Sequence, residues 1–266
     1  AALPRLETLS AEYTLLGVNM VDFMNGLLAD NNNSNNGNDA VGARPVFVLS
    51  SLTSLSFTDS ELGCDTQGPE HESADIDSFV RFLTFLPSLK HLSLAENDLP
   101  VRCLQAIGDQ IAASMTGLTS LDLHLACGRI LPNEHICAAG MRWLEHCVNL
   151  KHLYISSLNI DLSELSVIVS RLTACTGLVS LNISGNGREF EPHDTRRNDG
   201  YSTTLPALDL VTSIGKLPPS LTHLSLSGMT LSVLPPGSVR RNPHTLWHHE
   251  DIAAVADMIK RQLPGL

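Results

Sequence analysis

A short leucine phrase that recurs along the chain constrains the fold more than any other feature of the sequence. In its most regular copy, Leu89, Leu92 and Leu94 are followed by Asn97, which gives the pattern L-x-x-L-x-L-x-x-N. Further copies keep this spacing, some of them loosely, and the middle leucines of the whole set are Leu9, Leu55, Leu92, Leu121, Leu153, Leu181 and Leu224. A phrase that recurs in this way predicts an array of stacked structural repeats.

The distances between these leucines indicate what one repeat contains. Leu121 follows Leu92 by 29 residues, and Leu181 follows Leu153 by 28, so each repeat has room for a whole helix after its strand. Apolar residues recur at helical spacing over 76–85, 102–115, 136–144, 162–172, 205–214 and 251–259. Because a helix separates each strand from the next, we expect consecutive strands to run parallel. Right-handed stacking of such units gives a curved sheet inside and helices outside.

The repeats resemble those of leucine-rich repeat proteins of the ribonuclease-inhibitor-like, long-repeat type. Two copies match the family motif with its asparagine, namely Leu89, Leu92, Leu94 and Asn97, and Leu178, Leu181, Ile183 and Asn186. The resemblance implies an α/β fold, a right-handed solenoid or horseshoe with a parallel concave sheet and outer helices. It also implies a binding scaffold, seldom an enzyme. Residues 1–266 are expected to form a single array of about seven repeats, part of a longer chain.

Some copies depart from the motif, and the spacing between copies varies. Ser60, Ala126 and Thr14 replace the asparagine whose side chain satisfies backbone groups at the turn, so these repeats are expected to turn less regularly. Extra length falls in insertions at 30–45, 60–75, 187–203 and 235–249. The last three follow a strand and precede its helix, so they are expected to emerge on one edge of the array.

Composition limits the choice of cellular compartment and of ligand class. The formal net charge of −11 disfavours nucleic acid as the main ligand, and no apolar run is long enough to span a membrane. Six cysteines are scattered without CxxC pairs, and Cys147 and Cys175 occupy equivalent repeat positions, which predicts small buried groups. Reduced thiols favour an intracellular protein, with the cytoplasm preferred and a cytoskeletal or organellar assembly left open.

Side chains on the concave face are the first candidates for binding. In a strand the leucines point into the core and the residues between them point to the other face. The larger or chemically distinctive residues predicted there are His91, Ser93, Asp122, His124, His152, Tyr154, Asn182 and His223. Neighbouring strands lie about 4.8 Å apart, so these histidines are too widely spaced to share a zinc ion at Zn–N distances of about 2.0 Å. We expect them to be solvated or to contact a partner, without a metal or cofactor.

The insertions at 187–203 and 235–249 form a second candidate, the loop edge. They carry arginine and aromatic residues, which are enriched where partners are anchored. These residues are Arg188, Phe190, Arg196, Arg197, Tyr201, Arg240, Arg241 and Trp247. On an acidic protein such an edge indicates an acidic partner surface. The alternative is a pair of mobile polar insertions, with Trp247 packed against its own repeat.

The sequence therefore favours a non-enzymatic protein–protein interaction scaffold in a stable multi-subunit assembly, with one or more proteins as partners and no small-molecule substrate. The phosphate-loop, HExxH and GxSxG motifs are missing from the sequence. One alternative is a regulator of a small GTPase, resembling the GTPase activators of the Ran type. That family acts through a repeat-edge asparagine, whereas Asn97 and Asn186 look like ordinary motif residues. Another alternative is the sensor part of a larger receptor.

Overall fold

The computed structural model describes residues 6–12, 49–60, 62, 77–97, 99–127, 136–187, 204–229, 256–257 and 259–261. They belong to two compact units, Ala1–Arg129 and Ile130–Leu266. Apart from Ser60, Leu62 and Gly187, the predicted insertions lie outside the described residues.

The first unit contains four short parallel strands. They are β1 (Thr8–Ser10), β2 (Ser54–Ser56), β3 (His91–Ser93) and β4 (Ser120–Asp122). Each strand pairs with the next one in the sequence, and the register aligns the middle leucines Leu9, Leu55, Leu92 and Leu121. The predicted parallel order is confirmed in this unit.

The second unit repeats this arrangement with β5 (His152–Tyr154), β6 (Ser180–Asn182) and β7 (His223–Ser225). These strands also pair in parallel and in chain order, with Leu153, Leu181 and Leu224 aligned. Every strand in both units is therefore centred on a leucine that the sequence pattern identified.

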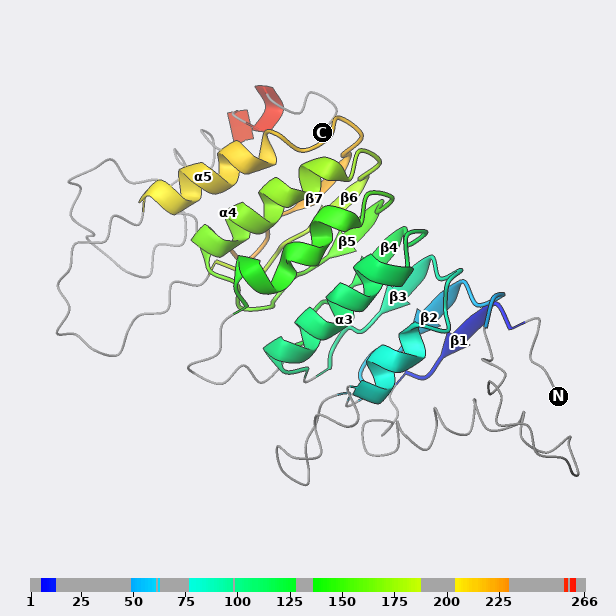
Figure 1. The fold of residues 1–266 in the computed structure, drawn as a ribbon. Helices are drawn as coiled ribbons and strands as arrows, with labels where there is room; N and C mark the ends of the chain where they lie inside the picture. Colours follow the sequence, from blue (N-terminus) through cyan, green and yellow to red (C-terminus); the bar gives the residue numbers. More distant parts are fainter. Residues whose placement is uncertain are drawn as a thin grey trace, which may run out of the picture. The chain divides into compact units, whose positions relative to one another are not determined.

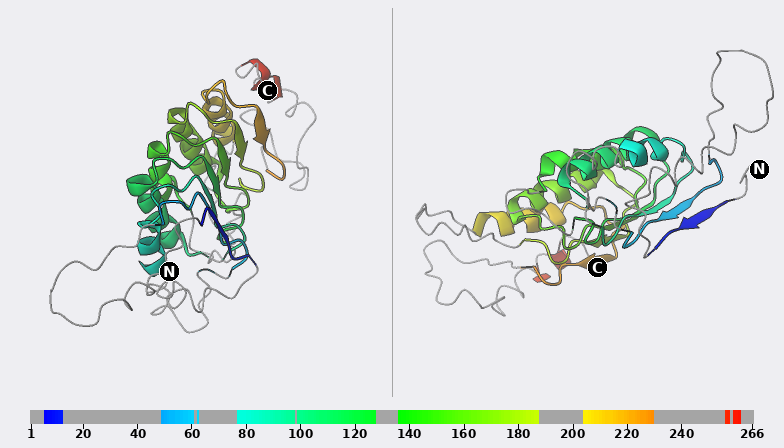
Figure 2. Two further views of the ribbon diagram at one scale, coloured as in Figure 1. Left: turned by 90° about the vertical axis from the view of Figure 1, so that its right-hand side faces the viewer. Right: turned by 90° about the horizontal axis from the view of Figure 1, so that it is seen from below.

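Helices alternate with the strands and lie on one side of them in each unit (Figures 1 and 2). The first unit has a helical segment at 77–83 and α3 (Val101–Ser114). The second has α4 (Leu162–Arg171), the short 3₁₀ helix η3 (Leu172–Ala174) and α5 (Thr204–Ile214), with α4 packed against α5. Residues 256–257 and 259–261 are helical as well. None of the described helices is long and apolar enough to cross a membrane.

The segment predicted as a helix over 136–144 differs from the others. It forms η2 (Ala138–His146), a 3₁₀ helix with non-helical dihedral angles at Met141. Its first residue is bonded on both sides by α4, because the Ala138 N–H donates to the Glu164 carboxylate and the Ala138 carbonyl accepts from Arg171. Arg171 also pairs with Glu145 at 3.1 Å. These contacts tie the start of η2 to α4, and Gly140 inside the segment disfavours a regular α-helix.

The leucine phrases supply the core between strands and helices. Leu92 and Leu121 are at most 2% exposed, and the residue two positions after each of them is fully buried. Phe57 from the β2 repeat meets Phe79 of the helical segment edge to face, with ring centroids 5.8 Å apart. Burial of these residues fixes which side chains of each strand face the core, since a shift by one residue would exchange the two faces.

Pairing between repeats extends beyond the three-residue strands. The Thr53 carbonyl accepts hydrogen bonds from both Lys90 N–H (2.8 Å) and His91 N–H (2.9 Å) at the start of the strands. Past their ends, the Glu96 N–H donates to the His124 carbonyl at 2.7 Å. This ladder holds the turns in register as well as the strands.

In the turns that follow β2 to β7, the residue four positions after the middle leucine lies in the left-handed region. Its φ lies between 49° and 69° in Asp59, Glu96, Leu125, Ser157, Gly185 and Gly228. Only two of these residues are glycine, although a side chain at positive φ costs about 1–2 kcal/mol. The ladder and the buried core therefore impose this conformation on residues that do not favour it.

Buried asparagines hold these turns from the following repeat. The Asn97 side chain accepts from the N–H groups of Ser60 (3.1 Å) and Leu62 (3.0 Å) and donates to the Phe57 carbonyl at 2.7 Å. It also donates within its own turn to the Leu94 carbonyl at 2.9 Å. Asn97 thus serves two consecutive turns.

Asn186 does the same in the second unit. Its side chain accepts from the N–H groups of Leu158 (3.0 Å) and Ile160 (3.3 Å) and donates to the Ile155 carbonyl at 2.7 Å. It also donates to the Ile183 carbonyl at 3.0 Å, within its own turn. Leu158, which stands where the motif has asparagine, thus lies in a turn held by the repeat that follows it.

The expectation that repeats without the asparagine turn less regularly is wrong for the turns at Ser60 and Ala126. Both keep the positive φ one residue earlier, at Asp59 and Leu125. At Ser60 the reason is visible, because Asn97 supplies the missing bonds and the Ser60 hydroxyl itself donates to the Ala11 carbonyl. Thr14 lies outside the described residues.

We predict that Asn97→Ala destabilises the protein far more than Ser60→Ala, although both residues are at most 2% exposed. The first change leaves several buried backbone groups without a partner, each costing about 1–3 kcal/mol. The second removes one hydroxyl group, which donates to the Ala11 and Thr58 carbonyls and contributes about 1 kcal/mol. Urea denaturation measures both losses of unfolding free energy. Equal losses would contradict the role assigned to the asparagine.

A second prediction concerns Gly185 and Gly228, the two glycines at this repeat position. A Cβ on Gly185 would lie 2.5 Å from the Ser157 hydroxyl oxygen, whereas one on Gly228 would meet only ordinary contacts at 3.7 Å. Gly228→Ala should therefore cost about 1–2 kcal/mol from the backbone alone, and Gly185→Ala should cost more. Adding Ser157→Ala should recover the excess in thermal unfolding, because it removes the clashing atom. A lack of recovery would show that the stacked turns do not limit this position.

The predicted burial of Cys147 and Cys175 is confirmed, and both thiols are free. The Cys175 thiol lies 3.2 Å from the Cys147 carbonyl oxygen. Burial, with a smaller effect of Cys175, raises the pKa of Cys147 from 9.0 to about 12, and burial raises the pKa of Cys175 to about 11. Both thiols are therefore protonated and unreactive in the native protein at neutral pH.

These raised pKa values predict a loss of stability in alkali. The unfolded chain releases both protons from pH 9 upward, while the native protein retains them, so each thiol lowers the unfolding free energy by about 1.4 kcal/mol per pH unit above pH 9. Urea denaturation between pH 8 and 10.5 should show a steeper loss in the wild type than in a Cys147→Ala/Cys175→Ala variant. Parallel pH profiles would contradict this origin.

Candidate functional site: the strand face

The strands of both units present a polar surface on the side opposite the buried leucines. We call it the strand face and define it by three positions of each repeat. In the first unit these are Thr8, Ser10 and Glu12, then Ser54, Ser56 and Thr58, then His91, Ser93 and Ala95, then Ser120, Asp122 and His124. In the second unit they are His152, Tyr154 and Ser156, then Ser180, Asn182 and Ser184, then His223, Ser225 and Ser227. All are exposed or half-buried except Ala95 and Ser156, which are buried.

In the first unit a chain of hydroxyl groups crosses this face. Ser10 and Ser56 both donate to one carboxylate oxygen of Glu12, at 3.0 and 3.1 Å. Ser56 also bonds to Thr58 at 3.1 Å, and Thr58 bonds to Ser93 on the next strand at 2.9 Å. The hydroxyls are thus held in fixed orientations across three strands before any ligand arrives.

The ends of the strands are fixed by side chains of the same face. An Asp122 carboxylate oxygen accepts from the His124 N–H at 2.9 Å, and the Asn182 amide oxygen accepts from the Ser184 N–H at 3.1 Å. These are equivalent positions in repeats of different units. Ser184 also bonds to Ser225 on the next strand at 2.6 Å.

The structure brings some of the predicted site residues together. In the first unit Ser93 is paired with Asp122, which is bonded to the backbone of His124, while His91 lies between Ser54 and Ser120 of the adjacent strands. The first unit therefore groups Ser93, Asp122 and His124 and places His91 two positions before Ser93, at the start of β3.

In the second unit Tyr154 is paired with Asn182, and these two larger side chains form its centre. His152 and His223 lie on either side of Ser180, so their backbones are two strand spacings apart, about 10 Å. The His223 ring nitrogen Nδ1 lies 2.8 Å from the Thr222 hydroxyl. In the described part of the chain, no group of three or more His, Cys, Asp or Glu side chains could hold a metal ion.

The loop edge predicted from sequence cannot be placed in the same way. All of its residues, from Arg188 to Tyr201 and from Arg240 to Trp247, lie outside the described residues. Its proposed role stays a prediction.

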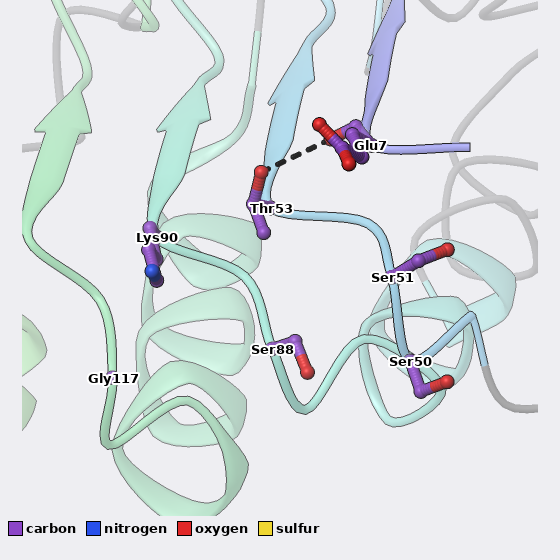
Figure 3. Close-up of a pocket in the computed structure, with 7 residues that line it drawn as sticks. All are labelled: Glu7, Ser50, Ser51, Thr53, Ser88, Lys90 and Gly117. Atoms are coloured by element: carbon purple, nitrogen blue, oxygen red, sulfur yellow. Dashed lines mark hydrogen bonds between the residues drawn. The ribbon is translucent and has the colours of Figure 1, made fainter. Parts of the chain in front are cut away.

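Two features of the first unit were not singled out by the sequence. One is the hydroxyl chain, in which Glu12 and Thr58 are linked through Ser56. Their common repeat position places them on the strand face, but that position does not reveal which hydroxyls bond to each other. The other is a polar pocket where the strands begin (Figure 3). It is lined by Glu7, Ser50, Ser51, Thr53, Ser88, Lys90 and Gly117.

A scan against protein-family models finds no match, and a search of curated proteins finds no similar sequence. Any functional assignment therefore rests on the geometry of the described residues.

Proposed function

We propose that this protein is a leucine-rich repeat solenoid of the ribonuclease-inhibitor-like type that acts as a non-enzymatic scaffold, binding partner proteins through its strand face. The observation that carries the proposal is the contrast between the two sides of each strand. One side is packed with leucine under helices, and the other displays hydroxyl, amide, imidazole and phenol groups in aligned columns.

The character of the strand face suits a protein ligand. Several of its hydroxyls already bond to neighbouring side chains of the face, so binding has fewer groups to order, which lowers the entropic cost of association. Tyr154 is half-buried beside Asn182, and tyrosine is among the residues that most often anchor interfaces. A flat row of small polar side chains around one aromatic group matches an extended protein surface better than a compact small molecule.

The outer helical layer offers less for recognition. In the second unit, α4 of this layer has a large exposed apolar side chain, Val167, which is 43% exposed. Val148, in the turn before β5, is 48% exposed. Single exposed apolar residues are normal on protein surfaces and do not indicate an interface. The strand face is therefore the better candidate in both units.

Matched substitutions test this assignment. Ser54 and Ser180 occupy the same repeat position on β2 and β6, and Thr173 is exposed on η3 of the helical layer. We expect Ser54→Arg or Ser180→Arg to weaken binding of a captured partner at least about tenfold, because arginine protrudes from a flat contact surface. Thr173→Arg should leave the affinity unchanged.

The measurement is affinity capture with the purified protein, followed by titration of the recovered partner against each variant. Circular dichroism checks that each variant is folded. If both strand-face variants bind as the wild type does and Thr173→Arg does not, the helical layer is the binding surface and the proposal is wrong.

A further inference from the structure

The polar pocket of the first unit lies where consecutive repeats begin, away from the strand face. It has a volume of about 640 Å³ and is lined by residues of the turns before β2, β3 and β4 and of the positions just before β1, β2 and β3. Figure 3 shows Glu7 and Lys90 on opposite sides of Thr53, with Ser50 and Ser88 below them. The pocket is thus built from equivalent positions of successive repeats.

Several hydrogen-bond donors in this pocket are unused. Within the described residues, the Lys90 amine forms no ion pair, and the hydroxyls of Ser50 and Ser88 make no hydrogen bond. The backbone N–H of Gly117 is also without a partner there. By contrast, the Thr53 hydroxyl already donates to the Glu7 carbonyl at 3.2 Å. Apart from the Glu7 carboxylate on the far rim, the unused groups are donors or hydroxyls, which suits a ligand that accepts hydrogen bonds.

The charged residues of the pocket further limit which class of ligand it can bind. Lys90 is exposed, and the residues at its position in the two adjacent repeats are the neutral Thr53 and Thr119. Glu7 is two strand spacings from Lys90, about 10 Å along the row of repeats. One cation neutralises a singly charged anion such as a carboxylate, whereas a doubly charged phosphate would keep one uncompensated charge in a pocket that also holds Glu7.

From these contacts we infer that the pocket binds a carboxylate group, with Lys90 as its charged anchor and the hydroxyls of Ser50 and Ser88 as hydrogen-bond donors. The carboxylate belongs to an acidic side chain of a partner protein, and only this last clause rests on the proposed function. The pocket would then fix one end of a partner that lies across the first unit.

Acetate is the probe for the site itself. Titration at constant ionic strength, followed through the backbone amide NMR signals of Ser88 and Gly117, should give saturable shifts with a dissociation constant on the order of 10 mM. Lys90→Gln should weaken acetate binding at least about fivefold, since the charged donor is lost. The matched control is Lys151→Gln, because Lys151 is exposed at the same repeat position in the second unit.

Each outcome decides the proposal. Saturation that is weakened by Lys90→Gln and not by Lys151→Gln supports it. Shifts that stay linear with acetate, or that are equal in both variants, overturn it. Tighter binding of inorganic phosphate than of acetate overturns the assignment to a carboxylate. Because the titration uses no partner protein, its result is independent of whether the strand face binds one.

Discussion

The need to satisfy buried backbone groups at the turns governs this structure. In the turns that follow β2 and β5, backbone N–H and C=O groups are bonded by a buried side chain of the next repeat. Buried polar groups without partners are costly, and the side-chain amide of Asn97 solves this for two turns at once. Where the motif residue is serine, its hydroxyl meets part of the need and the neighbouring asparagine meets the rest.

The hydrogen bonding of the turns also determines which surface is available for binding. Turns locked in register keep the strands in register, so residues at one repeat position form straight columns across each unit. The strand face and the pocket both arise in this way, the first from residues between the leucines and the second from residues before them. Their chemistry depends on side chains that the fold leaves unconstrained.

The sequence predicts the strands and most helices well because their signals are local and energetic. Leucines at fixed spacing must be buried, and that decides the strand centres from Leu9 to Leu224 and the helix at 102–115. The sequence does not predict the 3₁₀ geometry of η2, because apolar spacing over so short a segment does not separate a 3₁₀ helix from an α-helix. Nor does it predict positive φ at Leu125, since a leucine there opposes local preference and only the assembled ladder enforces it.

The candidate site, too, could be predicted only where the sequence signal is local. Membership of the strand face could be predicted, because side chains alternate along a strand. The link from Glu12 through Ser56 to Thr58 could not, because a serine hydroxyl can point in several directions and chooses among neighbours on three strands. The pocket could not be predicted either, because Ser50, Ser51, Ser88 and Gly117 belong to the turns, where the leucine pattern carries no information.

The backward reach of Asn97 gives the array a direction. The amide protons of Ser60 and Leu62 are bonded to a side chain that belongs to the repeat after theirs. These protons are protected from solvent exchange only while that later repeat stays folded, whatever the state of the repeat before them. Loss of order at the later repeat would therefore expose the amide protons of the turn before it.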